Sequence, residues 1–166
     1  EPNWMVFVPE TYRLSKKPRG DHTICMETDC GYQMSGFRFE RVRREFSEIN
    51  SASAEQIYGD KFTKGEDEVT GIGNNVVLDF GEFDFTDEQP SKLVICGRSP
   101  LPLNSIHLTA GTERILCEFR TEGESGYVER EFPLDGIAGK QNISFTFLPG
   151  SDFDFRSFRF EKQKEI

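Results

Sequence analysis

Tyr127 is the residue of this sequence best placed to contact a ligand. It follows the polar, glycine-containing segment 121–126 and precedes a run of alternating apolar and charged residues at 128–132. An exposed ring beside hydrogen-bonding groups in a loop is suited to pack against the apolar face of a sugar. Tyr127 is therefore the candidate stacking residue, and a packing role for its ring is the alternative. Tyr58 and Trp4 fit packing positions better, because Trp4 lies within an apolar run.

Catalytic and metal chemistry are not indicated. The two histidines, His22 and His107, have no nucleophile motif nearby, and no glycine-rich phosphate loop precedes a helix. The acidic runs at 66–68 and 122–124 are typical of solvated loops. The oxygen-rich positions Asp152 and Asp154 lack the spacing of a calcium-binding loop. We expect no catalytic residue, no metal and no cofactor in this chain, with a structural calcium as the alternative.

Composition excludes several partners. The net charge of −9 argues against nucleic acid, because phosphate binding needs clustered Lys and Arg. No apolar run approaches the roughly 20 residues of a membrane-spanning helix. The four cysteines, Cys25, Cys30, Cys96 and Cys117, lack zinc-site spacing and favour free thiols of a cytosolic protein, with disulfides as the alternative. The chain does not begin with Met, so we read it as a fragment of a longer protein.

The elements that must position Tyr127 are short strands. Apolar-rich segments recur between turn signals and show no helical period, which predicts an all-β, antiparallel β-sandwich of about ten strands. The segment 50–58 has room for one helical turn at most. The expected strands are 4–8, 23–27, 36–46, 75–85, 92–97, 105–109, 114–120, 127–132, 142–148 and 153–161.

The last of these segments changes phase. Phe153 and Phe155 share one parity, whereas Phe158 and Phe160 share the other. Because alternate residues of a strand point to opposite faces, either both faces are buried or a bulge at 156–157 shifts the phase. Residues 1–48 differ from the rest in their basic loop and two cysteines. They predict an N-terminal β-hairpin or linker extension that packs on a sandwich of residues 49–163.

Several motifs resemble a known family. The chain from about 52 to 161 resembles the family 6 carbohydrate-binding modules, which have a galactose-binding-like jelly roll. The motifs that carry the resemblance are Ser53-Ala54-Glu55, Tyr127 through Phe132-Pro133-Leu134, Gly139-Lys140, and Arg156-Ser157-Phe158-Arg159-Phe160. The segments 35–40, 57–62, 71–75, 95–101 and 147–151 are similar to the C-terminal module of bacterial glycoside hydrolase family 2 β-galactosidases.

The resemblance implies a site and shows where this chain departs from the family. Tyr127 takes the place of the family's stacking Trp, Ile72 that of the second aromatic ring, and Asp152 that of an Asn which reaches the sugar. Asn74 offers a further hydrogen bond. The family's structural calcium uses two acidic residues whose positions here hold Ser53 and Arg156, neither of which is a suitable ligand.

The function implied is that of a non-catalytic accessory module of a bacterial β-galactosidase-type enzyme. Its carbohydrate-binding residues would be Tyr127, Asp152 and Asn74, its ligand a galactose-containing sugar, and its neighbour the catalytic domain of the parent chain. The alternative is a structural module for interdomain contact or oligomerisation that binds no sugar. The cysteines favour the cytoplasm over secretion.

Overall fold

The structure, a computed structural model, describes residues 9–12, 22–29, 31, 33–39 and 44–162. The chain divides into two compact units, Glu1–Arg41 and Val42–Ile166. The described residues of the first unit are all exposed and include no helix or strand, so the strand expected at 23–27 is not formed. The strand expected at 4–8 lies outside the described residues. The hairpin of 1–48 and its packing therefore stay predictions.

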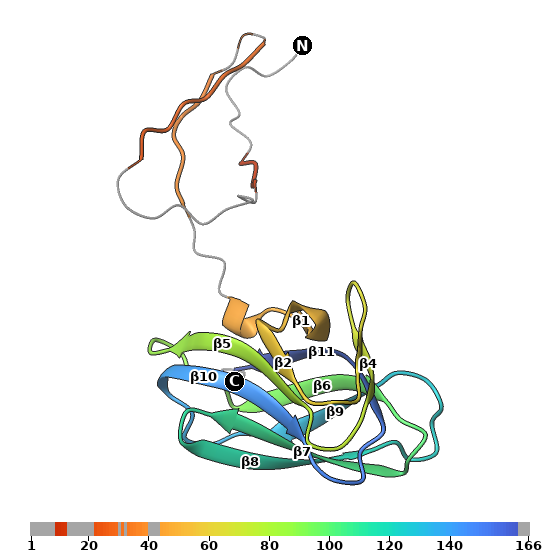
Figure 1. The fold of residues 1–166 in the computed structure, drawn as a ribbon. Coiled ribbons are helices and arrows are strands. Elements are labelled where there is room, and N and C mark those ends of the chain that lie inside the picture. Colours follow the sequence, from red (N-terminus) through yellow and green to blue (C-terminus); the bar gives the residue numbers. More distant parts are fainter. Residues whose placement is uncertain (1–8, 13–21, 30, 32, 40–43, 163–166) are drawn as a thin grey trace. The chain divides into compact units, whose positions relative to one another are not determined.

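The second unit is a β-sandwich, as the sequence predicts (Figure 1). Both of its sheets are antiparallel. One sheet, called sheet A, has the strand order β3-β4-β11-β6-β9, with β1 paired to β11; the other, sheet B, has the order β2-β5-β10-β7-β8. The strands of sheet A are β1 (Ile49–Asn50), β3 (Thr63–Lys64), β4 (Val69–Ile72), β6 (Lys92–Arg98), β9 (Val128–Pro133) and β11 (Phe153–Glu161). The strands of sheet B are β2 (Gln56–Tyr58), β5 (Val77–Phe85), β7 (Leu103–Ala110), β8 (Glu113–Arg120) and β10 (Gly139–Phe147).

Phenylalanine rings fill the space between the two sheets. Phe145 of β10 packs against Phe158 of β11 with ring centroids 4.8 Å apart, and Phe119 of β8 meets Phe153 of β11 at the same distance. All four rings are buried. Edge-to-face pairs of this kind add to the free energy gained by burying the rings. The phenylalanines therefore hold the sandwich together, and those of 153–160 do not form a surface for a ligand.

The phase change in the last strand is a β-bulge. The pairing of β11 with β6 shifts register between Phe155 and Ser157, so Arg156 is the extra residue. Phe153 and Phe155 before the bulge, and Phe158 and Phe160 after it, then all face the core. The predicted bulge is confirmed.

Most of the other expected strands are also found, in β5 through β11. The exception within the described residues, besides 23–27, is 36–46. Residues 36–39 form no strand, and Arg44–Phe46 form the 3₁₀ helix η1. The helical turn allowed in 50–58 is η2 (Ser51–Ser53). No helix in the described part of the chain is long and apolar enough to span a membrane.

The helix η1 attaches the start of the sandwich to sheet B. The Arg44 guanidinium donates to the carbonyl oxygen of Phe80 at 2.6 Å and lies 4.3 Å from the ring centroid of Phe83. The ammonium of Lys162, just after β11, lies 5.0 Å from the ring centroid of Phe46. The chain therefore enters and leaves the sandwich at neighbouring points.

Candidate functional site

Four loops meet at one end of sheet A. The neighbouring strands β4, β11, β6 and β9 are antiparallel, so the ends of β4 and β6 lie beside the starts of β11 and β9. Tyr127 directly precedes β9, and Arg98 is the last residue of β6. Asp152 precedes β11, and Asn74 lies in the loop after β4. The three residues predicted from sequence are thus at the same end of the sheet.

Two arginines cover the ring of Tyr127. The Cζ atom of Arg156 lies 3.7 Å from the ring centroid, and that of Arg98 lies 4.8 Å from it. Both distances are those of cation–π contacts. The Tyr127 hydroxyl is buried and has no hydrogen-bond partner among the described residues. Its burial, together with the nearby Glu68 carboxylate, raises the pKa of Tyr127 to about 12.

Each of these arginines also has a carboxylate partner. Arg98 donates to Oδ2 of Asp154 from Nε at 3.0 Å and from Nη2 at 2.6 Å. The other carboxylate oxygen of Asp154 accepts the backbone N–H of Gly71 at 2.8 Å. Arg156 forms a looser ion pair, with its Nε 3.6 Å from the Glu68 carboxylate. We call Tyr127, Arg98, Arg156, Glu68 and Asp154 the Tyr127 cluster.

The hydrogen bonds that fix Asp152 are made by its backbone, so its carboxylate is available to a ligand. Its N–H donates to Oδ1 of Asn104 at 3.1 Å, and its carbonyl oxygen accepts the Ser99 hydroxyl. Asn74 links two loops, because its Oδ1 accepts the backbone N–H of Gly150 at 2.7 Å. Neither residue is hydrogen-bonded to Tyr127. The structure therefore brings the predicted residues to one end of the sheet without joining them directly.

Sequence reasoning missed four members of the Tyr127 cluster as site residues: Arg98, Arg156, Asp154 and Glu68. Arg98 and Asp154 are directly opposite in the β6–β11 register although 56 residues separate them in the chain. Pairing between distant strands leaves no local pattern. The one sequence signal for Arg98 was its place in the segment 95–101, which resembles the C-terminal module of the β-galactosidases.

A calcium ion does not fit the two positions that the resemblance indicates. The Ser53 hydroxyl donates to the carbonyl oxygen of Asn50 at 2.6 Å, and Arg156 places a cation beside Glu68. A second positive charge there would be repelled by the guanidinium. Within the described residues, no group of three or more His, Cys, Asp or Glu could hold a metal ion.

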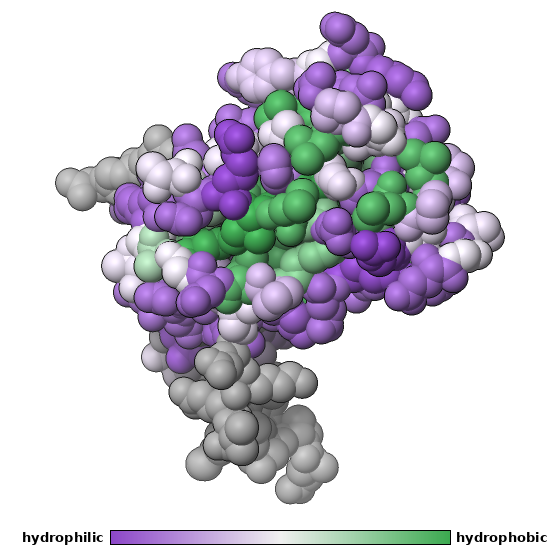
Figure 2. Space-filling view, turned by 90° about the horizontal axis from the view of Figure 1, so that it is seen from below, coloured by the Kyte–Doolittle hydropathy of each residue, from purple (hydrophilic) through white to green (hydrophobic). Residues whose placement is uncertain are grey.

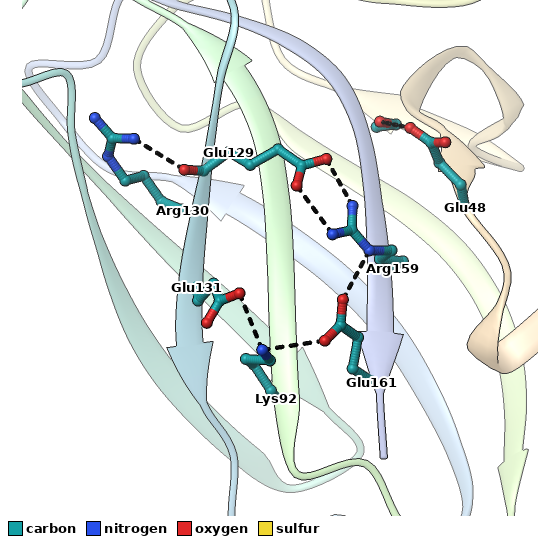
Figure 3. A network of polar contacts seen from close by, with 8 residues as sticks. Glu48, Lys92, Glu129, Arg130, Glu131, Arg159 and Glu161 are labelled. Atoms are coloured by element: carbon teal, nitrogen blue, oxygen red, sulfur yellow. Dashed lines mark hydrogen bonds and ion pairs between the residues drawn. The ribbon is translucent and has the colours of Figure 1, made fainter. Parts of the chain in front are cut away.

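The rest of the outer face of sheet A carries a network of ion pairs (Figure 3). Arg159 binds both carboxylate oxygens of Glu129, at 2.6 and 2.9 Å, and donates to Glu161 at 2.9 Å. Lys92 lies 2.9 Å from Glu131 and 3.1 Å from Glu161. The hydrogen bonds from Arg159 lower the pKa of Glu129. The hydrogen bond from Lys92 lowers the pKa of Glu161. The network joins three adjacent strands, and its charges are already paired.

A different surface carries apolar residues. Viewed from below, where β8 lies lowest in Figure 1, the molecule shows a band of apolar residues surrounded by polar ones (Figure 2). In the described part of the second unit, the exposed large apolar side chains are Tyr58 and Leu116. The described residues of the first unit expose more of them, Phe37 and Phe39 included.

Comparison with known proteins relates this sandwich to solved structures. No protein-family model and no curated protein matches the chain. A family 6 carbohydrate-binding module studied for its binding sub-sites matches with a TM-score of 0.62 and 15% identity, over 72% of this chain and 95% of that one. The sandwich has the fold of family 6 carbohydrate-binding modules.

Two further structures with the family 6 fold come from clostridia. A Clostridium stercorarium module in complex with cellobiose has a TM-score of 0.61 and 17% identity, over 72% of this chain and 95% of its own. A Clostridium cellulolyticum module in complex with xylose has a TM-score of 0.59 and 19% identity, over 71% and 98%. At these identities the likeness establishes the family 6 fold alone.

Proposed function

We propose that this protein is a non-catalytic carbohydrate-binding module that contacts its sugar at the loop end of sheet A. The observation that carries the proposal is the family 6 fold, with Tyr127, Asp152 and Asn74 at one end of one sheet. The motif resemblance supports the finer proposal of a galactose-containing ligand and a cytoplasmic, bacterial β-galactosidase as the parent chain, whose catalytic domain would be its neighbour.

The polar groups at this end are of the kind that bind sugar hydroxyls. The carboxylate of Asp152 can accept hydrogen bonds, and the amide nitrogen of Asn74 can donate one while its oxygen holds Gly150. Arg98 and Asp154 form a fixed donor–acceptor pair. Charge-assisted hydrogen bonds of this type are stronger than those between neutral groups.

Titration with sugars tests the proposal. Galactose, lactose and xylo-oligosaccharides would be titrated into the protein by calorimetry, with NMR to locate the shifted residues. We expect binding of at least one galactoside and a loss of affinity of tenfold or more in Tyr127→Ala.

Tyr58→Ala is the matched control. Tyr58 is an exposed tyrosine in β2 of the other sheet, so its removal should leave sugar affinity unchanged. Loss of affinity in Tyr58→Ala rather than in Tyr127→Ala would contradict the proposed location. Absence of binding to every sugar of the panel would refute the proposed function.

One observation favours a second function, a structural module that contacts a neighbouring domain or subunit. Phe37 and Phe39 are about 60% exposed, at 58% and 62%, in a unit whose described residues are all exposed. Clustered exposed aromatic rings are typical of interaction surfaces. On this alternative, the isolated protein self-associates in sedimentation velocity experiments, Phe37→Ser/Phe39→Ser does not, and no sugar binds.

A further inference from the structure

The arginines are more exposed than the carboxylates with which they pair in the Tyr127 cluster. The side chains of Arg156 and Arg98 are 50% and 43% exposed, whereas the Tyr127 hydroxyl beneath them is buried. A neutral sugar that stacks on a tyrosine needs an open ring face. One face of the Tyr127 ring is already occupied, because the Cζ atom of Arg156 lies 3.7 Å from the ring centroid.

Arg156 has hydrogen-bonding capacity to spare. A guanidinium carries five N–H donors. The contact of Arg156 with Glu68, at 3.6 Å, is an ion pair too long for a hydrogen bond, and the described residues supply no acceptor for its N–H groups. An ion pair this exposed contributes little to stability, so little free energy is lost when it breaks. A ligand anion that accepts two parallel hydrogen bonds can therefore compete with Glu68 for this guanidinium.

The second guanidinium contacts the same tyrosine ring. Both Cζ atoms lie within 4.8 Å of one ring centroid. Arg98 uses Nε and Nη2 on Asp154, which leaves Nη1 for another acceptor. The protein's net charge of −9 opposes an incoming anion, but charges farther away than about 8 Å are screened at physiological ionic strength. Among nearby charges, Asp154 and Glu68 are each matched by an arginine.

We propose that the Tyr127 cluster selects an anionic saccharide, whose acidic group binds Arg156 and Arg98, over its neutral counterpart. This inference rests on the proposed function and adds the class of ligand. The planar carboxylate of a uronic acid matches the guanidinium fork, and a sulfate ester offers similar acceptors from a different source. Arg156 is then the specificity-determining residue of the site.

The experiment compares matched pairs of ligands on the full chain by calorimetry. Digalacturonate is compared with galactobiose of the same linkage, and galactose 6-sulfate with galactose. We expect the acidic member of a pair to bind about tenfold more tightly, with the advantage falling as NaCl is raised. A preference for digalacturonate identifies the uronate as the ligand, and one confined to galactose 6-sulfate identifies the sulfate ester.

Variants test which residue causes the preference for the acidic sugar. Arg156→Ala should abolish the preference for the acidic sugar, and Arg156→Lys should restore only part of it, because an ammonium keeps the charge without the fork. Arg159→Ala is the matched control, since Arg159 lies in the same strand and is paired to Glu129. It should leave the preference intact. Circular dichroism spectra identical to that of the parent protein would show that each variant is folded.

The outcomes separate this inference from the proposed function. Equal affinity for acidic and neutral sugars, or a preference that survives Arg156→Ala, overturns the inference and leaves carbohydrate binding in place. Tighter binding of neutral galactobiose by Arg156→Ala, with no acidic preference in the parent protein, also overturns it and shows that Arg156 merely blocks the ring. If no sugar binds, the proposed function fails and the inference fails with it.

Discussion

The guanidinium of Arg156 lies over a tyrosine ring on one side and beside a carboxylate on the other. The resemblance places a metal-binding acid at this position, and the chain instead supplies its own positive charge. That charge is covalently attached and needs no ion from solution. At the scale of single residues, the site is therefore defined by arginines as much as by its aromatic ring.

The buried hydroxyl of Tyr127 leads to a prediction about stability. A buried polar group without a partner costs free energy, and removing it loses no hydrogen bond. We expect Tyr127→Phe to raise the free energy of unfolding by about 1 kcal/mol in urea titrations. A loss of stability would show that the hydroxyl is hydrogen-bonded, with the Glu68 carboxylate, which raises the pKa of Tyr127, as its acceptor.

In strand β11, one residue determines which side chains of the whole strand face the core. The bulge at Arg156 turns Phe158 and Phe160 toward the core in which Phe153 and Phe155 already lie. Without it, the alternation of the strand would direct the last two rings to the outer face.

Deletion of Arg156 tests this role of the bulge. We expect the deletion to cost several kcal/mol or to prevent folding, because large buried aromatic residues contribute about 3–5 kcal/mol each. Thermal unfolding followed by circular dichroism measures the effect. Deletion of Ser125, in the exposed loop before β9, is the control and should be tolerated. A variant that lacks Arg156 and melts at the same temperature as the parent protein would show that the bulge is not needed.

The ion pairs across β9, β6 and β11 make stability depend on pH. The pKa values of Glu129 and Glu161 are lowered from 4.5 in the folded state, chiefly by Arg159 for Glu129 and by Lys92 and then Arg159 for Glu161. Their contribution is therefore fully present above about pH 4.5 and is lost as the pH falls through the folded-state values. We expect Arg159→Ala to cost about 1 kcal/mol at pH 7.

The cost of Arg159→Ala should shrink below pH 4.5, where the carboxylates of the parent protein also become protonated. Urea unfolding at pH 7 and at pH 3 measures the difference. Arg120→Ala is the control, because Arg120 and Glu118 are both at least half exposed and should contribute little at either pH. A cost of Arg159→Ala that is equal at both pH values would refute the linkage.

The sequence allowed the longer elements to be predicted for physical reasons that also mark its limits. Strands of six to nine residues show a period of two, and the parity change at 153–160 indicated the bulge directly. Strands β1 to β4 have only two to four residues, too few to show a period. The arginine cover of Tyr127 could not be predicted, because Arg98 and Arg156 reach the ring through strand pairing rather than through proximity in the chain.

At the scale of the whole molecule, the second unit has a core of its own. Among the described residues, the buried apolar cluster lies between Ala54 and Phe160. We expect a chain that begins at Val42 to melt within a few degrees of the full chain by differential scanning calorimetry.

A chain that begins at Ser47 is the control, because it loses the Arg44 hydrogen bond to Phe80 and the packing of Phe46 on Phe85. These losses should lower its melting temperature by about 5–10 °C, since 1–2 kcal/mol shifts the midpoint of a domain this size by several degrees. If removal of residues 1–41 destabilises the protein as much as removal of 1–46, the second unit does not hold the whole core.

The contact between Phe46 and Lys162, at 5.0 Å, has a consequence for how such a unit can be carried by other proteins. This sandwich could be inserted into a surface loop of a host protein. Because its two ends are close, the insertion would hardly change the distance between the ends of that loop. Joining the two ends by a short peptide and opening the chain at an exposed loop such as 121–126 would give a circularly permuted sandwich with the same core. The closeness of Phe46 and Lys162 therefore gives the sandwich the end-to-end geometry that insertion into a loop requires.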